Sequence, residues 1–300
     1  MKSSIKILII LAIIGFILYY PGLQSKPYND DYHLFSKPAE FKPHQSFYQQ
    51  TPHVYFYRPL EKFLIWNYHN IFGINTLAVH ITALSLHILL SYMIYYVMTM
   101  IGLSRQESQL AVLIFLTSQS NVSAVVDIDS ISQLLSTFFG CAARLFTIKF
   151  FISKKRRNNF KGEINDKYLI WYWLSALCFF LSLLSKESGF SFLAMIFLLL
   201  TITYMRKDRI LRSLAKISFV FTPYLLLSLI YFILRTIAGY SIITPESNTY
   251  SFSISSNVIV NALSLGFSCL QPFSSVSVYI AIVENELTEM FFASAIPFFY

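Results

Sequence analysis

The feature that most constrains this chain is a series of apolar runs, each long enough to cross a lipid bilayer. A transmembrane helix needs about 20 predominantly apolar residues. The runs that meet this condition are Ile5–Pro21, Thr76–Ile101, Leu110–Val126, Ser132–Ile152, Tyr168–Leu184, Ser188–Tyr204 and Ile217–Arg235. A further apolar stretch, Ser255–Val283, contains Pro272 and several serines, so it could span, re-enter or lie in the interface. The sequence therefore predicts a helical bundle with seven or eight spans.

The amino-acid composition agrees with a multi-pass membrane protein. Hydrophobic residues make up 55% of the chain and charged residues only 13%, which is more apolar matter than a soluble core needs. The net charge of +8 could indicate a nucleic-acid partner, but the basic residues lie in short loops between apolar runs rather than in a polar domain. We therefore predict an all-α, polytopic transmembrane helical bundle, a single domain over residues 1–300, and no binding of nucleic acid.

The distribution of lysine and arginine predicts the orientation. With a cytoplasmic N-terminus, most of the 23 basic residues lie on the cytoplasmic side, as the positive-inside rule requires. The opposite, external face then receives the long loop 22–75, the turn Asp127–Ser130, the hairpin Ser185–Glu187 and the stretch after Arg235. Carboxylates are costly in hydrocarbon, so Asp127 and Asp129 are expected where a span leaves the bilayer, although they could simply cap a helix end.

The loop 22–75 is expected to contain one helix. Several prolines keep its first half irregular, and "YRPLEKFLIWNYHNIFG" then places Pro59 at a first helical position. Apolar residues recur at helical spacing at Leu60, Phe63, Leu64, Tyr68 and Ile71, while Glu61, Lys62 and Asn70 point elsewhere. This pattern is typical of a helix in the membrane interface, and it would also suit a helix packed against the bundle.

Two short charged motifs are candidates for chemistry. "KPYNDDYHLFSK" carries the adjacent carboxylates Asp30 and Asp31, whose repulsion can raise one pKa toward the range of a general base. Asn-Asp-Asp is also ordinary turn chemistry. Lys186 and Glu187 lie between two spans, where Lys186 could hold a phosphate. Alternatively, Glu187 stabilises a helix start and Lys186 extends to the interface.

Three motifs together resemble a known family. They are Tyr57–Leu60 followed by Phe72–Asn75 with His80 and His87, the hairpin "LLSKES" at Leu183–Ser188, and the pair Asp30-Asp31. In type and order they resemble multi-pass glycosyltransferases of the GT-C type that use lipid-phosphate sugars. In particular, the chain is similar to protein O-mannosyltransferase-like enzymes, including those with C-terminal tetratricopeptide repeats, and to their bacterial relatives.

The resemblance implies transfer of mannose or another hexose from a polyprenyl or dolichyl phosphate carrier to a protein or glycan hydroxyl. Asp30 would be the general base, and Asp31 would orient it or bind a divalent cation; no cofactor is otherwise implied. The substrate-binding residues would be Arg58, Lys186, Glu187, Arg235 and His80. His80 and His87 are alternatively bonded within the bundle, and we do not read them as metal ligands. The expected location is a bacterial inner membrane, with the endoplasmic reticulum as the alternative.

The chain also departs from these relatives. The relatives tend to have arginine and aspartate after the third span, where this sequence has Ile131 and Gln133. The sequence also stops in the apolar run "AIPFFY", so we expect a fragment or a shortened version. A truncated or non-catalytic membrane protein of this type therefore remains an alternative. A transporter or lipid flippase is another, but such proteins tend to have two similar halves, which this sequence lacks.

Overall fold

The computed structural model describes residues 2–27, 31, 42–50, 56–73, 75–118, 121–159, 167–205 and 210–240. Helices joined by turns and irregular segments make up these residues, with no strand among them. The first half contains α1 (Lys2–Tyr19), η1 (Tyr20–Gln24), η2 (Pro43–Phe47), α3 (Pro59–Phe72), α4 (Leu77–Met100), α5 (Arg105–Thr117) and α6 (Val122–Val126). The second half contains η4 (Ile128–Ser130), α7 (Ile131–Asn159), α8 (Lys167–Ser185), η5 (Glu187–Gly189), α9 (Phe190–Met205) and α10 (Ile210–Ile237).

Six of the seven expected spans are confirmed as helices with the length and apolarity to cross a membrane. In the described part of the chain these six segments are Ile5–Gln24, Leu77–Met100, Ile128–Ser153, Tyr168–Ser185, Glu187–Met205 and Leu211–Ile237. The apolar stretch Ser255–Val283 lies outside the described residues.

The expected span Leu110–Val126 is wrong as one continuous helix. The structure divides it into α5, which ends at Thr117, and the short helix α6. Polar residues explain the break, because the Asn121 side chain donates to the Phe115 carbonyl at 2.8 Å and so closes the end of α5. Ser118 adds a tight turn, its backbone N–H also directed at the Phe115 carbonyl, at 3.4 Å. Side chains that satisfy the last carbonyls compete with continuation of the helix.

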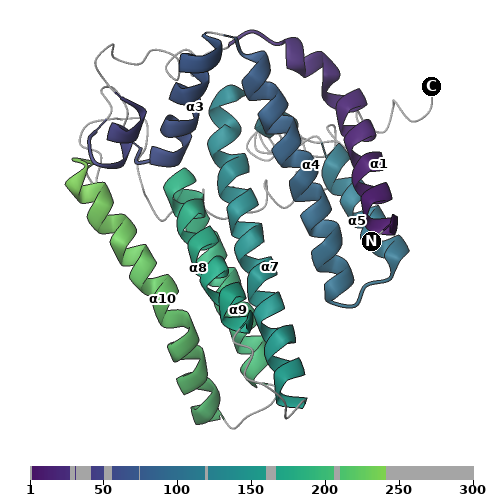
Figure 1. The fold of residues 1–300 in the computed structure, drawn as a ribbon, viewed down its shortest axis with the longest axis vertical. Helices are drawn as coiled ribbons and strands as arrows, with labels where there is room; N and C mark the ends of the chain where they lie inside the picture. Colours follow the sequence, from purple (N-terminus) through teal and green to yellow (C-terminus); the bar gives the residue numbers. More distant parts are fainter. Residues whose placement is uncertain are drawn as a thin grey trace, which may run out of the picture.

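Figure 1 shows how the helices are arranged. The chain rises along α1 and descends along α4, so that α3 lies at the same end of the bundle as the end of α1 and the starts of α4 and α7. The helices α8 and α10 run toward this end, which we call the α3 end, and α1 begins toward the opposite end. Residues that connect the helices at the α3 end are therefore brought together.

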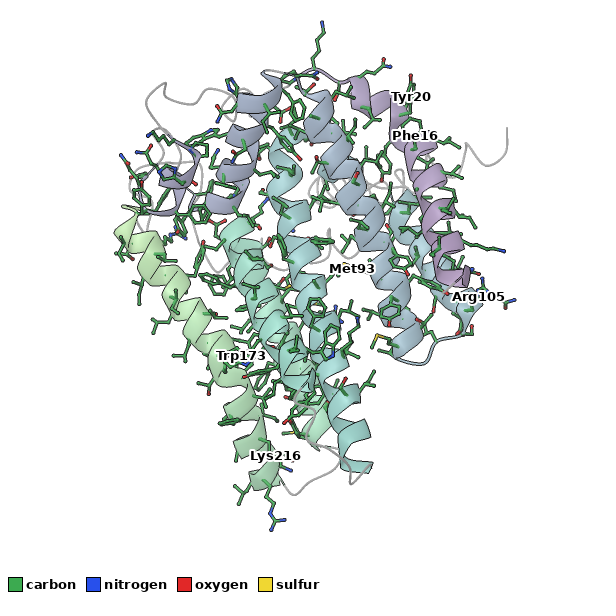
Figure 2. All side chains as sticks on the ribbon, in the orientation of Figure 1. Phe16, Tyr20, Met93, Arg105, Trp173 and Lys216 are labelled. Atoms are coloured by element: carbon green, nitrogen blue, oxygen red, sulfur yellow. The ribbon has the colours of Figure 1, made fainter. Side chains whose placement is uncertain are left out.

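The outer surface is apolar, as expected for contact with lipid. Phe16 on α1, Tyr20 on η1 and Trp173 on α8 are all exposed and can be located in Figure 2. Phe219 on α10 is 81% exposed although it lies within an apolar span. A soluble protein rarely exposes apolar surface on this scale. The chain is therefore an integral, multi-pass membrane protein.

Small polar residues bring α7 and α8 into close packing. Ser182 Oγ donates to the Ser136 carbonyl at 2.7 Å, and Ser175 Oγ donates to the Ala143 carbonyl at the same distance. Thr147 and Ser175 share a further hydroxyl–hydroxyl bond of 2.8 Å. In membranes, small residues allow helices to approach closely and hydroxyls supply bonds that lipid cannot. This pair forms the centre of the bundle.

The helix α3 begins at Pro59, as predicted, and the structure shows where its charged residues lie. Glu61 and Lys62 are buried against the bundle, together with Ile65 and Trp66. Part of the apolar pattern is exposed instead, with Ile71 70% accessible. Leu60, Leu64 and Tyr68 pack on the bundle cores, so the helix lies against the bundle, while Phe63 and Ile71 face outward.

Candidate functional site

Charged side chains gather at the α3 end. We call the following residues the charged cluster: Asp31, Arg58, Glu61, Lys62, Asp127, Asp129, Lys186 and Glu187. They come from segments far apart in the sequence, because the connections before α3, α7 and α9 meet at this end of the bundle.

Asp31 links the first loop to the start of α7. Its side chain is only 5% exposed, and its Oδ1 accepts a hydrogen bond of 2.9 Å from the Asp129 backbone N–H. Such a bond positions a carboxylate and satisfies a backbone donor of η4. Asp30, the expected general base, lies outside the described residues. The structure thus places the neighbour of that residue firmly against the Asp127–Ser130 turn.

Asp127 has a raised pKa. Partial burial is the main cause, and the like charges of Asp31 and Asp129 add to it. His80 is near this acidic group and is hydrogen-bonded within the bundle, with its Nε2 atom 3.2 Å from Ser25 Oγ. His80 is therefore at the acidic side of the charged cluster, next to Asp31 and Asp127 rather than among the other expected substrate-binding residues.

Arg58 and Glu187 join α3 to the turn between α8 and α9. Arg58 Nε lies 3.4 Å from Glu187 Oε2, and the two side chains are 13% and 28% exposed. The Arg58 guanidinium also stacks over the Phe56 ring, 4.7 Å from its centroid. Partial burial strengthens such a pair relative to one on an open surface. The pair therefore fixes the start of α3 beside Lys186.

Lys186 lies near both positively and negatively charged side chains. Its pKa is lowered, mainly by burial and further by the positive charge of Arg58, while Asp129, Glu61 and Glu187 act in the opposite direction. Because Asp129 also bonds Asp31, the first loop and the α8–α9 turn share one electrostatic environment. A lysine in this position retains N–H donors for an anionic ligand.

Glu61 is the least expected member of the charged cluster. It is 1% exposed, and its Oε1 atom has no hydrogen-bond partner. Burial raises its pKa to about 7, although Lys62, Arg58 and Lys186 act to lower it. Burial likewise lowers the pKa of Lys62. A buried carboxyl with a pKa near neutrality can hold or release a proton at physiological pH.

Arg235 lies at the edge of the cluster, near the end of α10. It donates a hydrogen bond to the Tyr231 hydroxyl, which also lies near Glu187. The Tyr231 hydroxyl in turn donates to the Tyr57 carbonyl at 3.3 Å. Arg235 is thus connected through Tyr231 to the segment that carries Arg58.

Of the expected substrate-binding residues, the structure brings together Arg58, Lys186, Glu187 and Arg235, and it places His80 apart beside Asp31. Within the described ranges, no group of three or more His, Cys, Asp or Glu side chains is arranged to hold a metal ion. Sequence reasoning missed Glu61 and Lys62. A usable signal was present, because both follow Arg58 within one turn of a helix starting at Pro59, close to a residue already expected in the site.

The class defined by this fold is a multi-pass α-helical membrane protein with a partly buried, mixed-charge cluster at one end. No protein-family model, curated protein sequence or solved structure matches the chain. The functional argument therefore depends on the chemistry of the charged cluster.

Proposed function

We propose that this protein is a membrane glycosyltransferase of the GT-C type. It transfers a hexose from a polyprenyl or dolichyl phosphate carrier to an acceptor hydroxyl at the α3 end, which faces away from the cytoplasm. The observation that carries the proposal is the meeting of the acidic first loop with the Lys186–Glu187 turn through Asp129. Transfer of this kind needs a proton acceptor and cationic donors in one place, at the membrane surface where the lipid phosphate lies.

In this proposal Asp30 accepts the proton of the acceptor hydroxyl as the oxygen attacks the anomeric carbon. The bond between that carbon and the carrier phosphate breaks, and the phosphate leaves with its electron pair. Asp31, anchored by the Asp129 N–H, orients Asp30. If a divalent cation takes part, Asp31 supplies one ligand to it.

Lys186, Arg58 and Arg235 hold the carrier phosphate through charge-assisted hydrogen bonds. Glu187 keeps Arg58 in position through the 3.4 Å pair. Protonation of Glu61 favours this step, because it removes a negative charge beside Lys186 and Arg58 before the anionic phosphate enters. The site can therefore accept a phosphate in spite of its many carboxylates.

The test is sugar transfer by the purified protein in lipid nanodiscs, with a radiolabelled polyprenyl-phosphate hexose as donor and a peptide or glycan hydroxyl as acceptor. Asp30→Asn should reduce turnover about 100-fold to 10,000-fold, the usual contribution of a general base. Glu107→Gln is the matched control, since this carboxylate is exposed at the start of α5 and, among the described residues, bonds only Ser104. It should leave turnover unchanged.

Each contrary result identifies an alternative. Full activity of Asp30→Asn would remove the proposed base. Movement of the sugar lipid across the bilayer without transfer would identify a flippase. Binding of the donor with neither transfer nor movement would identify a non-catalytic protein of this type.

A further inference from the structure

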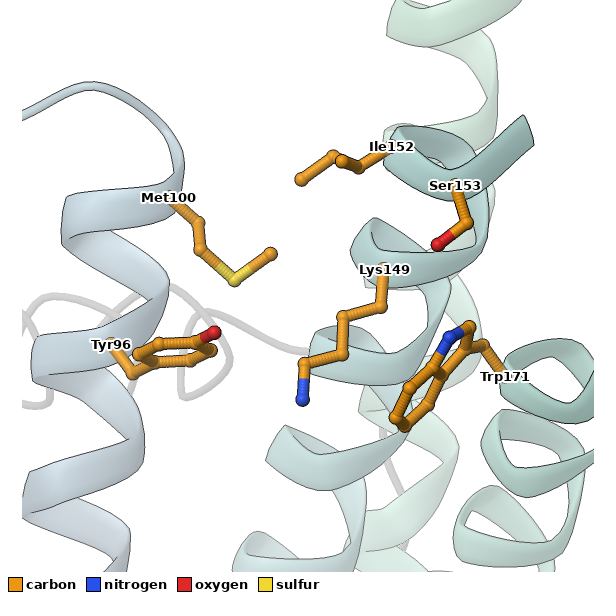
Figure 3. Close-up of a pocket in the computed structure, with 6 residues that line it drawn as sticks. All are labelled: Tyr96, Met100, Lys149, Ile152, Ser153 and Trp171. Atoms are coloured by element: carbon orange, nitrogen blue, oxygen red, sulfur yellow. The ribbon is translucent and has the colours of Figure 1, made fainter. Parts of the chain in front are cut away.

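A cavity of about 300 Å³ lies at the end of the bundle opposite the charged cluster. Three helices contribute its lining, which consists of Tyr96 and Met100 from α4, Lys149, Ile152 and Ser153 from α7, and Trp171 from α8. Figure 3 shows Lys149 extending from α7 into the space between Tyr96 and Trp171. The size is at the small end of ligand pockets, and it suits a lipid headgroup better than a whole lipid.

Lys149 is surrounded by aromatic rings. Its Nζ atom lies 4.7 Å from the centroid of Trp171, 5.4 Å from that of Tyr96 and 5.8 Å from that of Phe146. No ion pair or hydrogen bond joins this ammonium group to any residue in the described part of the chain. Cation–π contacts hold an ammonium in place but leave its charge uncompensated. Among the residues that the structure describes, the cavity therefore presents a positive charge without a counter-ion.

The cavity lies near the ends of three apolar spans, where a lipid headgroup is expected. Lys149 is four residues, or about 6 Å, from the end of the apolar span at Ser153. Tyr96 lies four residues before the end of its span at Met100, and Trp171 lies three residues after the start of its span at Tyr168. Tryptophan and tyrosine favour this boundary, where one side of the ring meets lipid and the other meets water.

We propose that this cavity binds the phosphate of an anionic glycerophospholipid in the adjacent leaflet. Lys149 pairs with the phosphate, the Ser153 hydroxyl is available to donate a hydrogen bond, and the apolar side chains of Ile152 and Met100 contact the glycerol and the first acyl carbons. Basic pockets between transmembrane helices recognise lipid headgroups in this manner.

Two features favour a lipid over free phosphate. The lining includes apolar side chains, which gain nothing from an inorganic ion but cover the apolar part of a lipid. Four basic residues, 154–157, follow the cavity directly along α7 and attract an anionic leaflet to this end of the bundle. The proposal does not depend on the glycosyltransferase function, because the charged cluster lies at the other end.

The experiment measures phospholipid retained by the protein after extraction from nanodiscs that contain equal amounts of phosphatidylglycerol and phosphatidylcholine. Native mass spectrometry counts each lipid. Lys149→Gln should reduce retained phosphatidylglycerol about fivefold, which is the contribution expected of one basic residue at an anionic surface. Lys149→Arg should keep most of it, and phosphatidylcholine should be unaffected by either change.

Lys216→Gln is the matched control, since Lys216 is an exposed lysine at the same end, on α10 (Figure 2). It should retain phosphatidylglycerol as the wild type does. Ile152→Trp keeps Lys149 but fills the cavity, so it should lose the lipid as well. The proposal would be overturned if Lys149→Gln retained as much phosphatidylglycerol as the wild type. It would also be overturned if the wild type retained phosphatidylcholine and phosphatidylglycerol equally. Release of the lipid by inorganic phosphate alone would overturn it as well, and would identify a free-phosphate site.

Discussion

The substitution Glu61→Gln tests the electrostatics of the charged cluster most directly. Burial raises the pKa of Glu61 from 4.5 to about 7. Between these values the folded protein binds more protons at this site than the unfolded chain does. The free energy of unfolding of the wild type should therefore fall as pH rises through this window.

The size of the effect follows from the shift. A change of one pKa unit corresponds to about 1.4 kcal/mol, so ionisation of buried Glu61 costs about 3 kcal/mol once the pH is well above 7. Glutamine has nearly the same shape and remains neutral at every pH. The stability of Glu61→Gln relative to the wild type should accordingly increase by about 3 kcal/mol from below pH 4.5 to above pH 7.

The assay is unfolding in detergent micelles, by heat or by sodium dodecyl sulfate, followed by circular dichroism at a series of pH values. Glu107→Gln is the control with the opposite sign, because hydrogen bonds from Ser104 lower the pKa of Glu107 and its ionised form stabilises the fold. Its relative stability should fall with rising pH. A difference between Glu61→Gln and the wild type that does not vary with pH would refute the reasoning.

Two further predictions concern the turn between α8 and α9. Gly189→Ala should destabilise the protein by about 1–3 kcal/mol, because an added Cβ would lie 2.9 Å from the backbone of Ser182, which cannot move aside. Thermal unfolding in detergent measures the change in stability, and unchanged stability would contradict the close approach. A double-mutant cycle with Arg58→Gln and Glu187→Gln should give a coupling energy of about 1 kcal/mol, since the two side chains are 3.4 Å apart and only partly buried. Zero coupling would show that the pair does not hold α3 in place.

Much of the bundle could be predicted from the apolar runs. Comparing the length of each run with the thickness of a bilayer predicted seven spans, of which the described residues show six, and Pro59 marked the start of α3. The span Leu110–Val126 failed because hydropathy counts apolar residues and does not register where polar side chains such as Asn121 bond a helix end. That hydrogen bond depends on the local geometry of the chain, which cannot be predicted from hydropathy.

The site was only partly predictable for a similar reason. The order of the spans predicted that Arg58, Lys186 and Glu187 lie at one end of the bundle, and the structure brings them together there. Periodicity, however, shows which residues share a face of α3 and does not show which face turns inward. The helix packs its charged residues Glu61 and Lys62 against other charges of the cluster, and neither residue was expected in the site. Only the tertiary partners decide such a case.

The hydroxyl bonds between α7 and α8 have a consequence for how the charged cluster can move. They join the two helices at several points along their shared length, so α7 and α8 form one rigid unit. Asp129, just before α7, and Lys186, just after α8, are both attached to this unit. We therefore expect an opening that admits a bulky molecule to come from movement of α3 or α10 relative to α7 and α8. Arg58 and Arg235 would travel with those helices, while Asp129 and Lys186 would keep their separation.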